Sequence, residues 1–94
     1  MLNQFEMWEV PSVKGSTGLL AELRLEISDG HDLFGLDCSV VAKRIDCDEI
    51  LVKTADDRFA LVHLTWKSNP EVAGYPASDW SDAASCLKLI EAIQ

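Results

Sequence analysis

The sequence has no long run of apolar residues, and its opening segment lacks the features of a signal peptide. Its apolar runs are only a few residues long, too short for a helix that spans a membrane. The segment MLNQFEMWEVPS mixes Asn, Gln and Glu among its apolar residues, whereas a signal peptide needs a basic start and a continuous apolar stretch. We therefore expect a cytoplasmic protein that does not associate with a membrane.

Cysteine and histidine residues with the spacing of a metal site are also missing. The three cysteines, Cys38, Cys47 and Cys86, form no CxxC motif, and an odd number cannot all be joined by disulfides within one chain. The two histidines, His31 and His63, fall in different predicted elements, so they complete no closely spaced zinc set. We expect reduced thiols that pack as small hydrophobic side chains, with no metal and no cofactor.

Basic residues are few, because 8 Lys and Arg stand against 16 Asp and Glu, for a formal net charge of -8. The cations are scattered among carboxylates that would repel a phosphate backbone, so nucleic-acid binding is not expected. The acids gather in short groups, among them Asp46, Asp48 and Glu49, then Asp56 and Asp57. Such groups suit a basic protein partner, and the alternative is that they only keep the protein soluble.

A chain of 94 residues, 48% hydrophobic and 26% charged, is typical of one globular domain over residues 1–94. The segment LLAELRLEIS predicts a helix that is capped by Ser16 or Thr17 and ends near Asp29–Gly30. Glu22 and Glu26 are expected on its polar side. Its apolar stripe comprises Leu19, Leu20, Leu23 and Ile27.

Three runs rich in β-branched and aromatic residues follow: SVVAKRI, EILVKTA and RFALVHLTW. Short acidic turns separate them, which predicts a three-stranded antiparallel meander with sequential pairing. Both faces of the third run hold apolar residues, so we expect it to be an interior strand. The short segment FEMWEV, which ends before Pro11, would make the sheet four-stranded if it joins an edge.

The C-terminal segment SDWSDAASCLKLIEAIQ predicts a second helix, capped by Ser78, after a loop formed by KSNPEVAGYPAS. Its expected apolar stripe contains Trp80, Ala83, Ala84, Leu87 and Ile90, with Cys86 and Ile93 beside it. Two amphipathic helices packed on one face of a short sheet would form a two-layer α+β sandwich. The predicted element order is (β)-α-β-β-β-α.

Two motifs, VPSVKGSTG and DDRFALVHLTWKSNPE, occur at residues 10–18 and 56–71. Together they resemble a group of small, mostly uncharacterised bacterial proteins, in which a glycine-rich helix start precedes a hairpin ending in VHLTW or a similar strand. The resemblance reaches from about Trp8 to Trp80 and implies a shared fold, with no activity to transfer. The turn here contains Asp56 and Asp57 where glycine is more common in such sequences.

Two further segments have features of a ligand site. Lys14–Gly18 places Ser16 and Thr17 before a helix, where free amides can hold an anion, but its lysine precedes the glycines, unlike a P-loop. An ordinary capped turn is the alternative. His63 is expected to be half-buried with one partner, or else to serve a binding face or a pH response. His31 is expected in a loop, bonded to backbone.

These observations favour a small acidic binding protein, in the manner of bacterial immunity proteins, which neutralises a basic toxin or effector domain without catalysis. The residues expected to contact the partner are Asp46, Asp48, Glu49, Asp56, Asp57, Trp8 and Tyr75. One alternative is a small-ligand or anion-binding protein or an enzyme that uses Lys14–Gly18 or His63. Another is a homodimer formed through an edge strand. The first hypothesis requires carboxylates that are not paired with the chain's own cations.

Overall fold

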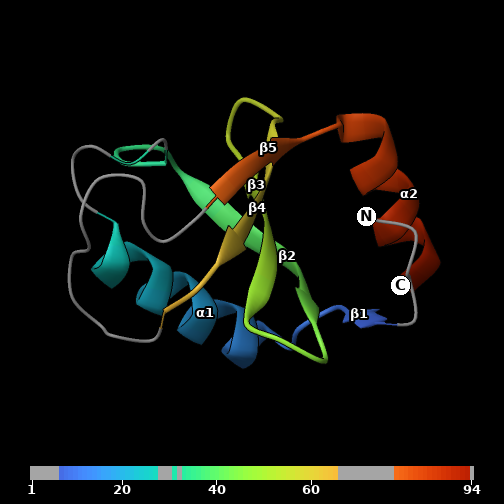
Figure 1. Cartoon of the computed structure of the whole chain (residues 1–94), viewed down its shortest axis with the longest axis horizontal. Helices are drawn as coiled ribbons and strands as arrows, with labels where there is room; N and C mark the ends of the chain where they lie inside the picture. The colour runs from blue at the N-terminus through green and yellow to red at the C-terminus, as the bar shows by residue number, and fades with distance from the viewer. Residues whose placement is uncertain (1–6, 28–30, 32, 66–77, 94) are drawn as a thin grey trace.

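The computed structural model describes residues 7–27, 31, 33–65 and 78–93, and within these ranges the chain forms a mixed α+β fold (Figure 1). A five-stranded antiparallel sheet has the order β1-β2-β3-β4-β5, so every strand pairs with its neighbours in sequence. The helices are α1 (Val13–Glu26) and α2 (Ala83–Ile93). The strands are β1 (Trp8–Glu9), β2 (Cys38–Arg44), β3 (Glu49–Thr54), β4 (Phe59–His63) and β5 (Ser78–Ser81).

The three central strands confirm the predicted meander. β2 pairs with β3 from Cys38 opposite Thr54 to Lys43 opposite Ile50, with an irregularity between Val40 and Ala42. β3 then pairs with β4 along its length. β-branched side chains suit these strands because they pack well on a pleated surface. The sheet is wider than the three or four strands predicted, since β1 and β5 extend it at both edges.

Strand β5 corrects the predicted start of the second helix. Ser78–Ser81 pairs with β4, and Trp80 stands opposite Ala60. The cap of α2 is Asp82 and not Ser78, because Asp82 Oδ2 accepts the Ser85 N–H at 3.0 Å. The carboxylate stops the helix from extending further back and leaves the preceding residues to pair with β4. The predicted loop KSNPEVAGYPAS lies outside the described residues except for Ser78.

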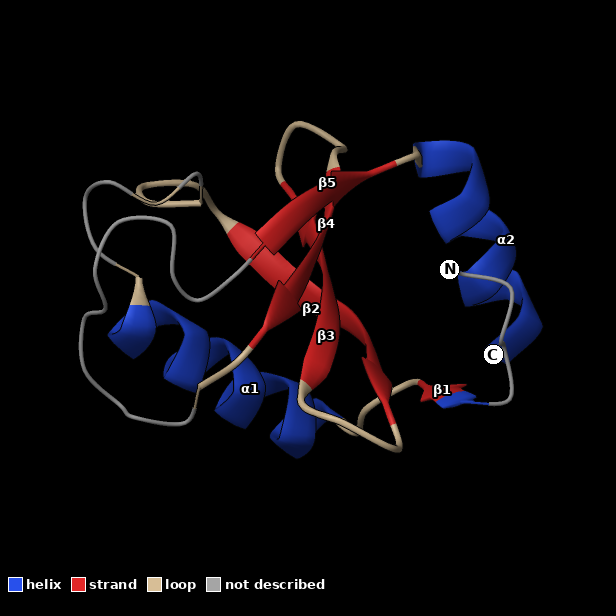
Figure 2. Cartoon of the chain, viewed as in Figure 1, coloured by secondary structure: helices blue, strands red, loops and turns tan. Residues whose placement is uncertain are grey.

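The two helices cover opposite faces of the sheet, as Figure 2 shows, so the fold has three layers and not the predicted two. The cause is that the central strands carry apolar residues on both faces, and each face needs a cover. The α1-face core contains Leu23, Leu33, Val40, Ile50, Val52, Ala60, Val62 and Leu64. The α2-face core contains Trp8, Ala42, Leu51, Phe59, Leu61, Cys86 and Leu89.

The apolar stripe of α1 is confirmed, and that of α2 is confirmed only in part. Leu23 is buried in the α1-face core, and its predicted stripe neighbours pack around it. In α2 the buried residues are Cys86 and Leu89, with Ile90 beside them, whereas Leu87 is 54% exposed. The C-terminal sequence contains apolar residues on two adjoining helical stripes, and the later start of α2 turns the second one toward the sheet.

The start of α1 also differs from the prediction. Its cap is Ser12, whose Oγ accepts the Gly15 N–H at 3.0 Å, so the helix begins four residues before Thr17 at Val13. Ser16 and Thr17 lie inside the helix, and their hydroxyls donate to backbone carbonyls at 3.2 and 2.9 Å. α1 ends at Glu26, and the predicted end near Asp29–Gly30 lies outside the described residues.

Two glutamates of α1 are buried, contrary to their expected place on the polar side. Glu22 is 7% exposed, and Glu26 is completely buried. Glu26 Oε1 accepts the N–H of Thr65 at 2.9 Å, just after the end of β4. A buried carboxylate needs such partners, because burial without them would be costly. Glu26 therefore links α1 to the segment that follows β4.

The cap of α2 provides a pH-dependent test. Hydrogen bonds from the backbone and side chain of Ser85 lower the pKa of Asp82. The ionised carboxylate therefore stabilises the fold above its unfolded pKa, and this contribution is lost as the pH falls through the lower folded pKa. We expect Asp82→Ala to lower Tm at about pH 7 and to have little effect at about pH 2. Circular dichroism melts across this range measure the difference.

The matched control for this cap is Glu91→Ala, which removes an exposed acid from the same helix. Glu91 caps no helix end, so its removal should leave Tm nearly unchanged at both extremes of pH. If Asp82→Ala lowers Tm by the same amount at about pH 2 as at about pH 7, Asp82 is not a charged cap.

Candidate partner-binding site

The β2–β3 turn, residues 45–48, has outward side chains on an anchored backbone. All four residues are exposed, and Ile45 is 60% exposed. The Ile45 N–H donates to the carbonyl of Met7 at 2.7 Å, and the Leu64 N–H donates to the carbonyl of Asp48 at 3.0 Å. The turn is therefore tied at one end to the segment that begins β1 and at the other to the residue after β4.

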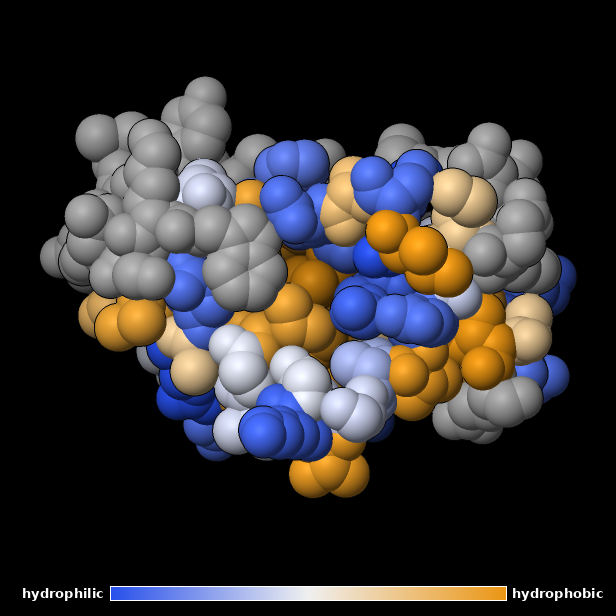
Figure 3. All heavy atoms as spheres, turned by 90° about the horizontal axis from the view of Figure 1, so that it is seen from below, coloured by the Kyte–Doolittle hydropathy of each residue, from blue (hydrophilic) through white to orange (hydrophobic). Residues whose placement is uncertain are grey.

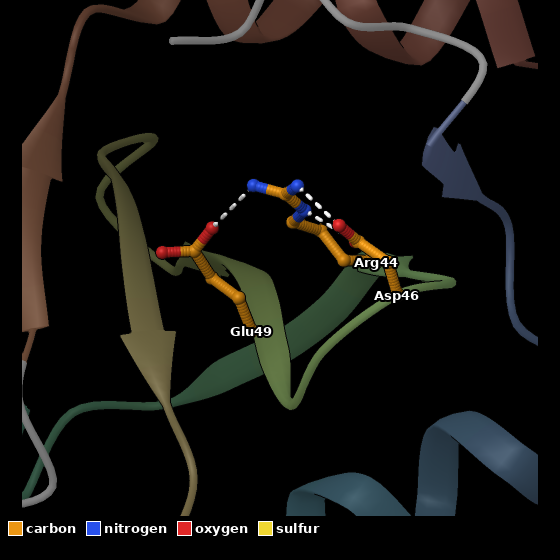
Figure 4. Close-up of polar contacts among 3 residues, drawn as sticks. All are labelled: Arg44, Asp46 and Glu49. Atoms are coloured by element: carbon orange, nitrogen blue, oxygen red, sulfur yellow. Dashed lines mark hydrogen bonds and ion pairs between the residues drawn. The ribbon is translucent and has the colours of Figure 1, made fainter.

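Arg44 spans this turn and holds two of its carboxylates, as Figure 4 shows. Its Nε and Nη2 donate to the two oxygens of Asp46 at 2.9 and 2.8 Å, and its Nη1 lies 3.5 Å from Glu49 Oε1. The hydrogen bonds from Arg44 lower the pKa of Asp46 and raise the pKa of Arg44 itself. The forked geometry of the guanidinium fixes the turn more firmly than a single contact would.

The β3–β4 turn is held by similar internal contacts. Arg58 Nε donates to Asp56 Oδ2 at 2.8 Å, and Lys53 Nζ lies 3.2 Å from Asp57 Oδ1. The Thr54 hydroxyl also donates to Asp56, and this bond is the main reason why the pKa of Asp56 is lowered, ahead of Arg58. Asp57 has φ of 64°, a left-handed conformation that aspartate tolerates better than most residues. The hairpin therefore closes without glycine.

The ion pairs correct the expectation that the carboxylates of both turns are unpaired. Four of the five predicted residues, Asp46, Glu49, Asp56 and Asp57, are bonded to Arg44, Arg58 or Lys53. In the described part of the chain, the Asp48 side chain is the only one of the five without such a contact. The sequence places a cation close to each turn. Arg44 is the last residue of β2, Lys53 lies near the end of β3, and Arg58 directly precedes β4. The β3–β4 turn is thus locally balanced, whereas the β2–β3 turn keeps an excess of carboxylate.

Of the two aromatic residues predicted to contact the partner, only Trp8 lies in the described part of the chain, and it is buried. Trp8 is only 4% exposed, because β1 places it in the α2-face core, where the Arg44 guanidinium lies 5.8 Å from its ring centroid. Tyr75 lies outside the described residues. Trp80, expected in the core, is 41% exposed on β5, and the Arg58 guanidinium lies 4.1 Å from its ring centroid. Its edge-strand position, which the sequence did not indicate, explains this exposure.

The predicted anion-binding loop is not a loop. Lys14, Ser16 and Thr17 all lie in α1, and the first helical amides are already bonded to Ser12, at 3.0 Å for Gly15 and 2.7 Å for Ser16. The amides of Gly15 and Ser16 are therefore occupied by the helix and its cap. The expected loop is helical because Ser12 starts the helix ahead of both glycines.

The histidines differ from each other in burial. His63 is exposed, not half-buried as predicted, and within the described ranges its side chain has no hydrogen bond or ion pair. His31 is buried, and its Nδ1 accepts the N–H of Leu33 at 3.0 Å, which confirms a loop residue bonded to backbone. His31 thus shapes the turn that leads into β2, while His63 faces solvent at the end of β4.

The three cysteines are free thiols in different environments. Cys86 is buried as expected, Cys38 is half-buried, and Cys47 is exposed in the β2–β3 turn, contrary to the expectation of burial. Burial raises the pKa of the Cys38 and Cys86 thiols, which makes both poorer nucleophiles. Among residues with a described position, no three His, Cys, Asp or Glu side chains group as metal ligands. The helices described here are too short or too polar to cross a bilayer.

The β2–β3 turn is thus the site that best combines charge, exposure and a fixed shape. Figure 3 shows that hydrophobic side chains on the face seen from below form separate groups divided by hydrophilic ones, so this face offers no broad apolar surface. A mixed apolar and acidic turn is the more specific feature. Compared with protein families, curated proteins and solved structures, the chain has no significant match in any of the three.

Proposed function

We propose that the protein is a non-catalytic binding protein that engages a basic protein partner through its β2–β3 turn. The observation that carries this proposal is an exposed Ile45 among carboxylates that outnumber the cation holding them. Arg44 is the only cation bonded to Asp46 and Glu49 in the described part of the chain, and Asp48 has no ion pair there. A partner with a cationic surface would therefore meet a net negative turn.

The internal ion pairs reduce this negative charge without removing it. Asp46 is partly exposed, and its oxygens can accept further hydrogen bonds, so a partner's lysine or arginine can share the carboxylate without displacing Arg44. Asp48 makes no ion pair within the described ranges, so its carboxylate can bind a partner's cation directly. Electrostatic attraction of this kind mainly speeds association and selects the partner. Asp48 is accordingly the strongest charged candidate for a direct contact.

Ile45 supplies the apolar part of the proposed contact. It is 60% exposed, although its backbone is fixed by the bond to Met7. Apolar anchors with a polar rim carry most of the energy in many protein interfaces. Because Arg44 already orders the turn, little conformational entropy would be lost on binding. This arrangement supports a turn that inserts a small apolar side chain into a basic pocket.

We further propose that the partner is a toxin or effector domain with a cationic active site, which this protein neutralises in the cytoplasm in the manner of an immunity protein. A carboxylate-rich turn can occupy a site that normally attracts phosphates, and it does so without any reaction. The suitable partner for a test is any basic C-terminal domain that sequencing of the neighbouring reading frames identifies.

Charge reversal at Asp48 tests the proposed site. We expect Asp48→Lys to weaken binding to that basic domain by about tenfold or more, the effect of one lost charge contact. The matched control is Glu91→Lys, which makes the same charge change on an exposed residue of α2. Titration calorimetry at low and high salt gives both dissociation constants, and sedimentation velocity checks that each variant keeps its oligomeric state.

A second substitution separates general charge from local contact. Ile45→Ser leaves the net charge unchanged and should still weaken binding, because it removes the apolar anchor. Equal effects of Asp48→Lys and Glu91→Lys, together with no effect of Ile45→Ser, would show that the turn is not the interface. The proposal would then fail even if the acidic protein still attracts the basic domain over long range.

A further inference from the structure

A cavity of about 310 Å³ lies between the C-terminal half of α1 and the segment that leads into β2. Its lining is mainly aliphatic and comes from both elements: Leu20, Leu23, Ile27, Leu33 and Leu36. The volume is at the lower end of the range for small-molecule pockets, roughly 300–1,000 Å³. The size therefore suits a ligand with a few apolar carbon atoms.

Two side chains of opposite charge line the same cavity. Arg24 comes from the last turn of α1, and Asp37 immediately precedes β2. Neither forms an ion pair with another described residue, and both are exposed. Burial is the main reason why the pKa of the Cys38 thiol is raised, while Arg24 lowers it and Asp37 raises it further. Both charges thus act on one point of the cavity wall.

The wall opposite α1 is a defined turn. The Phe34 N–H donates to the carbonyl of His31 at 3.0 Å, and the Leu36 N–H donates to the carbonyl of Leu33 at 3.2 Å. Gly35, between them, has φ of 80°, a conformation that glycine adopts without strain. The turn holds Leu33 in the core and leaves Phe34 exposed beside the cavity. The site is therefore shaped before any ligand arrives.

We propose that this cavity binds a small zwitterion with an apolar chain, the chemistry of a free aliphatic amino acid. The aliphatic lining would bury the chain, the Arg24 guanidinium would bind the carboxylate, and the Asp37 carboxylate would accept hydrogen bonds from the ammonium group. A ligand that is only anionic would be repelled by Asp37, and a neutral apolar ligand would gain no contact with either charge. This site is separate from the β2–β3 turn and does not depend on the proposed function.

L-leucine is the probe for a test on the full chain. Cys38 lines the cavity, whereas Cys47 is exposed in the β2–β3 turn, so the two thiols provide a signal and an internal control. Leucine should slow alkylation of Cys38 and leave that of Cys47 unchanged. It should also shift the amide resonances of residues 33–38 in a nuclear magnetic resonance titration.

Two analogues of leucine test the charge complementarity on the native protein. 4-Methylpentanoate lacks the ammonium group, and 3-methylbutylamine lacks the carboxylate. We expect each to bind about tenfold more weakly than leucine, because each leaves one charged side chain without its partner. If both analogues bind as well as leucine, the cavity recognises only an apolar chain and the proposal is wrong.

Two variants assign the charges to their partners. Arg24→Gln should weaken the binding of leucine and 4-methylpentanoate but not that of 3-methylbutylamine. Asp37→Asn should weaken the binding of leucine and 3-methylbutylamine but not that of 4-methylpentanoate. Lys88→Gln and Glu91→Gln are matched controls on α2, outside the cavity lining. Leucine binding that neither cavity variant weakens, or no binding of leucine, valine or phenylalanine at about 10 mM, would overturn the proposal.

Discussion

Replacing Trp8 with alanine is expected to lower the free energy of unfolding by about 3–5 kcal/mol, the usual loss for a large buried aromatic residue. Trp8 is 4% exposed and packs in the α2-face core, where it joins the sheet to α2. Alanine at this position would leave a cavity below the helix. Because a domain of this size has a total stability of only about 5–15 kcal/mol, the variant will be close to unfolding at moderate temperature.

Urea unfolding followed by circular dichroism measures this loss, and Trp80→Ala is its control. Trp80 is 41% exposed and contacts Arg58, so its removal should cost no more than about 1 kcal/mol. Trp8→Phe should retain more stability than Trp8→Ala, since it fills more of the space. Trp8→Phe also removes the indole N–H, which has no hydrogen-bond partner among the described residues. Equal losses for Trp8→Ala and Trp80→Ala would contradict the burial of Trp8 in the α2-face core.

The second large effect is expected at Glu26. Glu26→Ala removes the buried acceptor of the Thr65 N–H, and we expect a loss of about 2–3 kcal/mol in the free energy of unfolding. Two causes add together, because the amide of Thr65 loses its partner and the space of the side chain is left empty. Chemical denaturation measured in parallel with the native protein gives the difference.

Two further variants separate the lost acceptor from a general effect on α1. Glu26→Gln keeps a carbonyl oxygen that can accept the same N–H, so it should lose about 1 kcal/mol or less. Glu91→Ala removes an exposed glutamate from α2 and should be nearly neutral. If Glu26→Ala is as stable as Glu91→Ala, the buried hydrogen bond does not contribute to stability. If Glu26→Gln loses as much stability as Glu26→Ala, the loss comes from the missing charge and not from the missing acceptor.

The sequence was sufficient for those elements whose pattern is local. The meander of β2, β3 and β4 follows from three β-rich runs with short turns, and the stripe of α1 follows from leucines at helical spacing. Strand β5 was missed because its short polar segment carries no strand pattern. Its structure depends on pairing with β4, a contact that no local preference expresses.

The arrangement of the layers and the burial of Glu26 depend on tertiary contacts. The apolar residues on both faces of β4 already indicated that an element must pack on each face of the sheet. They did not indicate which helix packs on which face. Glu26 lies one helical turn from Leu23 and next to Ile27, so its place on the edge of the apolar stripe was visible. Its hydrogen bond to Thr65 was not, because 39 residues separate the two partners.

The positions of the acidic turns were predictable, but their internal pairing was not recognised. Arg44 and Asp46 are two residues apart, as are Arg58 and Asp56, a spacing that places side chains on the same side of an extended chain. The cavity is different, because nothing in the order of residues brings Arg24 and Asp37 together. Only the packing of α1 beside the start of β2 does so.

The division of the fold into two cores has a consequence for synthesis on the ribosome. Every residue of the α1-face core precedes Thr65, whereas the α2-face core needs Cys86 and Leu89 from the last helix. The first core can therefore assemble while α2 is still inside the exit tunnel. During that interval Phe59 and its neighbours are uncovered, so the nascent chain is most prone to aggregate until α2 leaves the tunnel.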